Sequence, residues 1–161
     1  MAFKKKTTAV LLAAVLLMLP NLGAALAAEE TDPAAEFRAE MLRLVNEERE
    51  KAGLAPLEFH EELTKAAQRR AEEAAEKFSH TRPDGARWVT VFEEHGLKYQ
   101  VAGENLAKGF RTAAAMVRAW MNSEGHRANI LASDYTYLGV GYCVREDGTI
   151  FTAQLFYTPA K

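Results

Sequence analysis

The chain begins with helical hydrophobic spacing and ends with strand-like alternation. Asp32 followed by Pro33 is typical of a helix start, because the aspartate can cap the first turn and proline fits the first helical position. Apolar residues then recur at i, i+4, i+7 and i+8: Phe37, Met41, Leu44 and Val45. This spacing predicts a helix that buries one stripe and ends at Gly53.

A second helix is predicted from about Phe59 to Phe78, with an alanine-rich face that would let another element approach closely. Its remaining positions are mostly charged: Glu61, Lys65, Arg69, Arg70, Glu72, Glu73, Glu76 and Lys77. A run of mixed charges on a helix is most simply a solvated face, so we expect these side chains to point outward. We expect His60, near the helix start, to be a surface residue as well.

The segment Thr112–Trp120 also predicts a helix, because Thr112 can cap it and three alanines favour it. Gly125 then breaks the helical pattern and allows a sharp turn of the backbone. His126 follows directly, so the fold is expected to hold this histidine in a fixed position at a corner.

Two segments near the C-terminus, Tyr137–Val144 and Ile150–Tyr157, alternate between inward and outward residues as strands do. The Asp-Gly dipeptide between them is a strong hairpin signal. Tyr99–Ala102 is a shorter candidate strand, and Gly103–Gly109 is predicted to turn. Helices first and a hairpin last predict an α+β domain in which helices cover a small antiparallel sheet.

The N-terminus has the three parts of a secretory signal peptide: basic Lys4–Lys6, an apolar run over Ala9–Pro20, and the small-x-small pattern Ala25–Ala27. A retained membrane anchor is the alternative, but it needs about 18 or more apolar residues. The apolar run has only 12. We therefore predict a signal peptide at 1–27, a short lead at 28–36, and one domain at 37–161 with no transmembrane anchor after processing.

Composition narrows the possible partners. The formal net charge is −2 and becomes more negative once the basic leader is removed, which excludes binding to nucleic acid by bulk charge. Cys143 is the only cysteine, so no internal disulfide can form. It lies in an alternating apolar run and is expected to be a buried small hydrophobe rather than a reactive thiol. The exported domain is expected to be extracellular or associated with the cell envelope.

Three side chains that could do chemistry stand where predicted elements end or turn. His80 follows the second helix, just before a turn-forming Pro-Asp-Gly. A helix C-terminus favours an imidazolium, so a simple capping role for His80 stays open. Glu104 has apolar neighbours and must be hydrogen-bonded or paired if it is buried. His126 is the third candidate, on its glycine corner.

Six segments occur in one order along the chain: Leu44–Arg49, Ser79–Gly85, Gly103–Ala107, Trp120 with Ser123, Gly125–Leu131 and Leu138–Gly141. Together they resemble the CAP superfamily, the cysteine-rich secretory, antigen 5 and pathogenesis-related 1 group whose domain is also called SCP. The closer match is to its bacterial secreted branch. The resemblance implies an α-β-α sandwich, which agrees with the α+β prediction.

The resemblance also implies a central cleft lined by two histidines and two acidic residues. Three of these positions match His80, Glu104 and His126. The position of the second acidic residue holds Ser123 instead. Glu124 follows one residue later, and a one-residue shift on a helix turns the side chain by roughly 100°. Whether Glu124 lines the cleft or points away from it therefore stays open.

Two classes of function follow from the resemblance. The first is a secreted binding module for a metal ion, a lipid, a sterol or another small apolar or polar ligand, with a cell-envelope or host-interface role. The second is a metal-assisted hydrolase or peptidase, in which His80 and His126 bind zinc or another divalent metal and Glu104 acts as the base. Catalysis is not a settled property of the superfamily, so we expect a binding protein rather than an enzyme.

Ser123 and His126 are spaced i, i+3, which suggests a nucleophile and its base. Serine catalysis would also need an orienting acid and an oxyanion hole, so a helix-capping hydroxyl is the simpler interpretation of Ser123. Asn105 and Asn129 are expected to be scaffold residues that bond to the backbone. Gln154, among strand hydrophobes, is expected to tie the sheet to the floor of the cleft.

Overall fold

The fold is that of a computed structural model in which residues 32–161 are described. The predicted signal peptide at 1–27 and residues 28–31 of the predicted lead lie outside the described residues. In chain order the elements are α1 (Pro33–Lys51), β1 (Glu58–Phe59), α2 (Glu61–Glu76), the 3-10 turn η1 (Trp88–Thr90), α3 (Val91–Glu94), β2 (Tyr99–Lys108), α4 (Ala113–Met121), α5 (Glu124–Ile130), β3 (Tyr137–Val144) and β4 (Ile150–Pro159). Within residues 32–161 no helix has both the length and the apolar character needed to cross a membrane.

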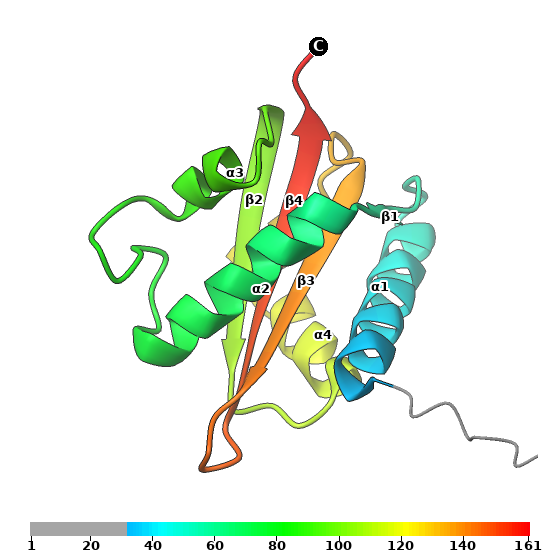
Figure 1. Cartoon of the computed structure of the whole chain (residues 1–161). Coiled ribbons are helices and arrows are strands. Elements are labelled where there is room, and N and C mark those ends of the chain that lie inside the picture. The colour runs from blue at the N-terminus through cyan, green and yellow to red at the C-terminus, as the bar shows by residue number, and fades with distance from the viewer. Residues whose placement is uncertain (1–31) are drawn as a thin grey trace, which may run out of the picture. The chain divides into compact units, whose positions relative to one another are not determined.

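One four-stranded sheet runs through the domain in the order β1-β3-β4-β2. Strands β3 and β4 form the predicted antiparallel hairpin, and β2 pairs antiparallel with the other side of β4. The sheet differs from the prediction in being mixed, because the two-residue strand β1 pairs parallel with β3. Strand β2 has a partner on one side only and forms an edge of the sheet (Figure 1).

Helices cover both faces of this sheet, which confirms the α+β class and the α-β-α sandwich (Figure 1). On one face α2 and α3 pack against β4, with Leu63 and Leu155 in the contact. On the opposite face α1, α4 and α5 share a core that includes Met41 and Trp120. Cys143 is half-buried beside the alanines of α2, and burial raises the pKa of its thiol.

Two glycines of β3 let α2 lie directly on the sheet. A Cβ atom at Gly139 would stand 2.4 Å from the carbonyl oxygen of Leu63, and one at Gly141 would stand 2.0 Å from that of Ala67. Both distances are far below van der Waals contact, and the obstacle is helix backbone that cannot move aside. The Gly-Val-Gly pattern of β3 is therefore a packing requirement of the α2 face.

The first residues of helices α1 and α2 are stabilised by capping side chains. Asp32 caps α1 by accepting from the Ala34 backbone N–H at 2.9 Å, and proline follows at the first helical position, as predicted. Helix α2 starts at Glu61 rather than near Phe59. His60 is half-buried rather than a simple surface residue, because its Nδ1 accepts from the Leu63 N–H at 3.3 Å and so caps the helix.

The prediction that all the charged residues of α2 point outward was wrong for two of them. Arg70 is 0% exposed and Glu73 is 4% exposed. They lie inside because they pair with each other, with Arg70 Nη1 donating to Glu73 Oε2 at 2.6 Å. The other charged residues named for this face are exposed. A buried ion pair therefore replaces part of the expected solvated face.

The predicted turn at Gly103–Gly109 was also wrong, because β2 continues as a strand through Lys108. Glu104 therefore lies in the middle of a ten-residue strand rather than in a loop. A Cβ atom at Gly103 would stand 2.4 Å from Oη of Tyr135. This glycine makes room for a tyrosine side chain and does not turn the chain.

Candidate functional site

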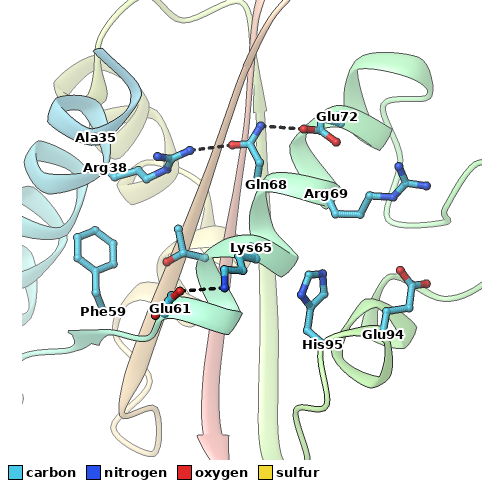
Figure 2. Close-up of a pocket in the computed structure, with 11 residues that line it drawn as sticks. Ala35, Arg38, Phe59, Glu61, Lys65, Gln68, Arg69, Glu72, Glu94 and His95 are labelled. Carbon is cyan, nitrogen blue, oxygen red and sulfur yellow. Dashed lines mark hydrogen bonds and ion pairs between the residues drawn. The ribbon is translucent and has the colours of Figure 1, made fainter. Parts of the chain in front are cut away.

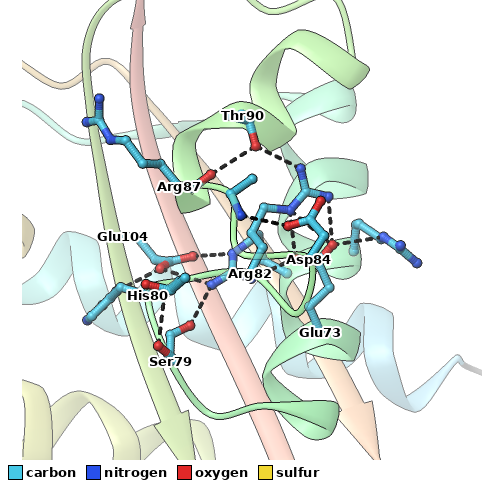
Figure 3. Close-up of polar contacts among 12 residues, drawn as sticks. Glu73, Ser79, His80, Arg82, Asp84, Arg87, Thr90 and Glu104 are labelled. Atoms are coloured by element: carbon cyan, nitrogen blue, oxygen red, sulfur yellow. Dashed lines mark hydrogen bonds and ion pairs between the residues drawn. The ribbon is translucent and has the colours of Figure 1, made fainter.

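His80 and Glu104 make a direct contact between two of the predicted site residues. His80 lies in the loop that follows α2, and Glu104 lies in β2. His80 Nδ1 and Glu104 Oε1 are 2.7 Å apart (Figure 3). The Glu104 side chain is 1% exposed, whereas the His80 side chain is 58% exposed. A buried carboxylate thus holds one nitrogen of a ring that faces solvent.

Arg70 of α2 holds the same carboxylate from the other side, and the sequence analysis did not identify it. Arg70 Nε donates to Glu104 Oε2 at 2.7 Å, and Arg70 Nη2 donates to Oε1 at 3.3 Å. Both Glu104 oxygens are therefore engaged before any ligand arrives. The arrangement satisfies the expectation that a buried carboxylate is paired. Its geometry suits Glu104 to orienting the His80 ring.

The surroundings of His80 favour its charged form. The hydrogen bond to Glu104 raises the pKa of the His80 imidazole, and the negative charge of Glu104 adds to this, while burial and the positive charge of Arg70 oppose it. His80 lies beyond the end of α2, which ends at Glu76. Its strong partner is the β2 carboxylate, so the cause of its charge preference is an ion pair more than a helix terminus.

His126 is held on α5 by a neutral partner. Its Nδ1 lies 2.9 Å from the Ser123 hydroxyl oxygen. Ser123 stands at the N-cap position of α5 but makes no capping hydrogen bond with its side chain, so the predicted capping role was wrong and the hydroxyl meets the imidazole instead. Burial lowers the pKa of His126, and the charge of His80 lowers it further.

An amide network fixes α5 against β2. Asn105 Nδ2 donates to the His126 carbonyl at 3.2 Å and to Gln154 Oε1 at 3.2 Å. Asn129 Nδ2 donates to the Glu104 carbonyl at 3.1 Å and to Asn105 Oδ1 at 2.9 Å. These contacts agree with the scaffold roles expected for the two asparagines, and the Gln154 contact joins β4 to β2 within the sheet.

The two histidines approach the edge strand from opposite faces of the sheet. Glu104 and Asn105 are neighbours in β2, so their side chains point to opposite faces. Glu104 meets the α2 side and holds His80, whereas Asn105 meets the α5 side and binds the backbone of His126.

Each imidazole is left with one ring nitrogen for a ligand. Nδ1 is engaged in both, by Glu104 in His80 and by Ser123 in His126. Among residues 32–161, no hydrogen bond engages Nε2 of either ring. The site therefore offers two oriented imidazole nitrogens at the β2 edge.

Glu124 lies in the first turn of α5 and is exposed. In the part of the chain that the structure describes, no hydrogen bond or ion pair joins it to His80, Glu104 or His126. Over the same residues no group of three or more histidine, cysteine, aspartate or glutamate side chains is placed to hold a metal ion. Within residues 32–161, Glu124 therefore takes no part in the polar contacts of His80, Glu104 and His126.

A groove of about 900 Å³ lies elsewhere, on the outer side of α2 (Figure 2). None of the predicted site residues lines it. Its charged side chains are largely satisfied by one another, as where Lys65 pairs with Glu61 at 2.8 Å and Arg38 donates to Gln68 at 3.0 Å. The groove therefore favours no particular class of ligand.

Comparisons with known proteins agree with the fold and the order of the motifs. The model of the cysteine-rich secretory protein family (CAP) matches residues 42–156. The uncharacterized protein YkwD of Bacillus subtilis is 42% identical over 120 residues, which cover 73% of this chain and 46% of that protein. An extracellular protein of Bacillus anthracis with an SCP domain superposes with a TM-score of 0.70 at 28% identity, over 77% of this chain and 41% of that one.

An outer surface protein of Borrelia burgdorferi also superposes with a TM-score of 0.70, over 76% of this chain and 92% of that one. At 23% identity this likeness shows the fold alone. The chain spans less than half the length of YkwD and of the Bacillus anthracis protein. What those longer proteins do as a whole can therefore enter only as a proposal.

Proposed function

The chain belongs to the cysteine-rich secretory protein (CAP) family, and from that premise we propose that it is an exported binding module whose cleft binds a divalent metal ion through His80 and His126. The observation that carries this proposal is the hydrogen bonding of the two imidazole rings. Each has its Nδ1 held by a partner and its Nε2 left over. Metal-binding histidines are usually held in this way, with the second nitrogen bonded to a carboxylate or another polar group.

The donor set fits a site with two protein ligands. Glu104 would support His80 rather than bind the ion, because both of its oxygens already contact Arg70 or His80. Zinc prefers four ligands, and structural sites supply all of them from protein. We therefore expect water or a bound ligand to complete the coordination here, with an affinity well below that of a structural zinc site.

A metal-assisted hydrolase or peptidase is the alternative, and one observation favours it. With only the two ring nitrogens of His80 and His126 as protein ligands, the proposed metal position would stay open to water, as a hydrolytic metal site needs. Bound zinc would polarise a substrate carbonyl or activate water. The engagement of both Glu104 oxygens favours a holding role over the role of general base, so binding is the better-supported function.

Isothermal calorimetry with Zn²⁺ tests the metal proposal on the purified protein. We expect the double variant His80→Ala with His126→Ala to lose zinc binding while keeping its thermal unfolding transition. His95→Ala is the matched control, because His95 lies on the α2 groove beside Glu62 and should leave zinc affinity unchanged. Equal zinc affinity in the double variant and the wild type would overturn the proposal.

The hydrolase alternative predicts turnover of a peptide library in the presence of zinc, lost in Glu104→Gln. Absence of turnover in a broad screen, with or without zinc, leaves the binding module as the function. Lipid or sterol binding is a further form of that module, supported by the family resemblance. Mass spectrometry of lipids that co-purify with the protein tests it, and a protein that is empty and takes up neither sterol nor fatty acid counts against it.

Export is part of the same proposal. The leader at 1–27 and the family membership support it. N-terminal sequencing of the protein recovered from the culture medium should begin at Ala28. A protein that is retained in cells with an intact Met1 would contradict it.

A further inference from the structure

We propose that Arg70 is the positioning residue for His80, fixing both the direction of its ring and the backbone that carries it. This inference rests on the proposed use of His80 as a ligand. Arg70 projects from α2 and is 0% exposed. It touches neither the solvent-facing ring nor the open nitrogen, so its effect on the site must pass through the groups that it holds.

The first group is the Glu104 carboxylate. Arg70 Nε and Nη2 donate to its two oxygens at 2.7 and 3.3 Å, which fixes the plane of the carboxylate. His80 Nδ1 lies 2.7 Å from Oε1, the oxygen that Arg70 Nη2 also contacts. A carboxylate that is fixed in two directions fixes the ring bonded to it. The Nε2 atom of His80 is then presented in one direction.

The second group is the main chain directly before His80. Arg70 Nη2 donates to the Ser79 carbonyl at 2.9 Å. The same guanidinium therefore anchors the loop one residue ahead of the histidine and also anchors the partner of its ring. Motion of the loop and rotation of the His80 ring would each change the position of Nε2. The Arg70 side chain restricts both motions.

The third group is the Glu73 carboxylate, which holds Arg70 in place. Arg70 Nη1 donates to Glu73 Oε2 at 2.6 Å, and Arg82 Nη2 donates to Glu73 Oε1 at 2.6 Å. Arg82 lies in the His80 loop and also donates to Thr90 at 2.9 Å. The loop is thus clamped on both sides of His80. Four buried charges, two of each sign, balance in this network.

Arg70→Lys is the decisive variant, because lysine keeps the charge but has a single nitrogen on a flexible stem. It cannot hold two carboxylate oxygens, Glu73 and the Ser79 carbonyl at once. Arg69→Lys is the matched control, since Arg69 is the exposed neighbour and, among residues 32–161, its ion pair is with Glu73 Oε1 at 3.1 Å and not with Glu104. Thermal unfolding establishes that each variant is folded.

Long-range ¹H–¹⁵N spectra of the metal-free protein, at a pH where both rings are neutral, give the first measurement. In the wild type we expect His80 in the single tautomer with Nδ1 protonated toward Glu104. Arg70→Lys should give a mixture of tautomers at His80 and leave the His126 signals unchanged, and Arg69→Lys should change neither ring. A folded Arg70→Lys with the wild-type His80 tautomer overturns the proposal.

Zinc calorimetry gives the second measurement. Loss of an outer partner of a metal-binding histidine typically lowers metal affinity by about 10- to 100-fold, and we expect a decrease in that range for Arg70→Lys. Equal zinc affinity in folded Arg70→Lys and the wild type overturns the proposal. A wild type that binds no zinc, with a His80 tautomer that still depends on Arg70, ends the metal function but supports the positioning role.

If Arg70→Lys does not fold, the double variant Arg70→Gln with Glu73→Gln replaces it. That pair removes one buried charge of each sign and so keeps the network balanced. The same tautomer mixture at His80 is expected. A single wild-type tautomer in the folded double variant overturns the proposal.

Discussion

The two sides of strand β2 hold their histidines by opposite means. On the α2 side, His80 is bonded to Glu104, which is paired with buried Arg70. On the α5 side, His126 is held by neutral groups, a hydroxyl at its ring and the Asn105 amide at its carbonyl. The pKa of His80 is raised by its hydrogen bond to Glu104, whereas the pKa of His126 is lowered by burial.

The two histidines can therefore be in different charge states at the same pH. A protonated His80 and a neutral His126 can coexist near pH 6.5, the ordinary imidazole value. The two supports should also respond differently to mutation. Removing part of a buried ion network leaves an uncompensated charge, whereas removing an amide leaves only unpaired hydrogen-bonding groups.

The largest expected effect comes from removing the charge on the α2 side. Among residues 32–161, Arg70→Met would leave the buried Glu104 carboxylate with the solvent-facing His80 as its remaining cationic partner, and we expect a loss of about 3–5 kcal/mol in the free energy of unfolding. Urea denaturation measures this loss. Arg69→Met, at an exposed neighbouring position, is the control and should change little. An equal loss in both variants would contradict the assignment of Arg70 to the buried network.

A smaller loss is expected from the neutral side. Asn105→Ala would remove the donor to the His126 carbonyl and to Gln154 and leave buried polar groups unpaired, which typically costs about 1–3 kcal/mol. Urea denaturation gives the value, with Gln100→Ala, an exposed change on the same strand, as the control. A loss for Asn105→Ala larger than that for Arg70→Met would reverse the contrast between the two sides.

Removing the ring partner of His126 should have a still smaller effect. Ser123→Ala takes away one hydrogen bond at 2.9 Å between half-buried groups, and we expect about 0.5–1.5 kcal/mol. The hydroxyl makes no capping bond, so helix α5 should keep its amide protection from hydrogen exchange. Loss of protection along α5 would show that the hydroxyl caps the helix after all.

The last prediction concerns pH. The raised pKa of His80 means that its ion pair stabilises the fold below about pH 6.5 and that this contribution is lost as the pH rises through the folded pKa. The lowered pKa of His126 has the opposite effect: its contribution is present above about pH 6.5 and is lost as the pH falls through the folded pKa. An NMR titration should give the higher midpoint for His80. The reverse order of midpoints would contradict the comparison.

The sequence predicted the elements whose signals are local. The Asp-Pro start of α1, the Asp-Gly hairpin of β3 and β4, and the helix that Thr112 caps all appear in the structure. Each depends on residues within one or two turns of the chain. The order of motifs was also enough to identify the family and with it the α-β-α fold.

Arg70 was missed although a signal was present. Leu63, Ala66 and Ala67 form the buried stripe of α2, and a residue seven positions after Leu63 lies on the same stripe. Residue type was given more weight than spacing, because a charged side chain in a helix is usually solvated. The partner that makes burial possible, Glu104, is 34 positions away and could not be found from the helix itself.

By itself the sequence determined the family and the fold class, and it marked the two histidines as candidate site residues. Only the tertiary structure decided what each histidine bonds to, because those partners come from other elements or from a helix corner whose geometry packing sets. It placed Glu104 in an edge strand between two layers, so that one carboxylate could meet Arg70 from a helix and His80 from a loop. A contact between elements distant in the chain depends on how the layers pack, and local spacing does not contain that information.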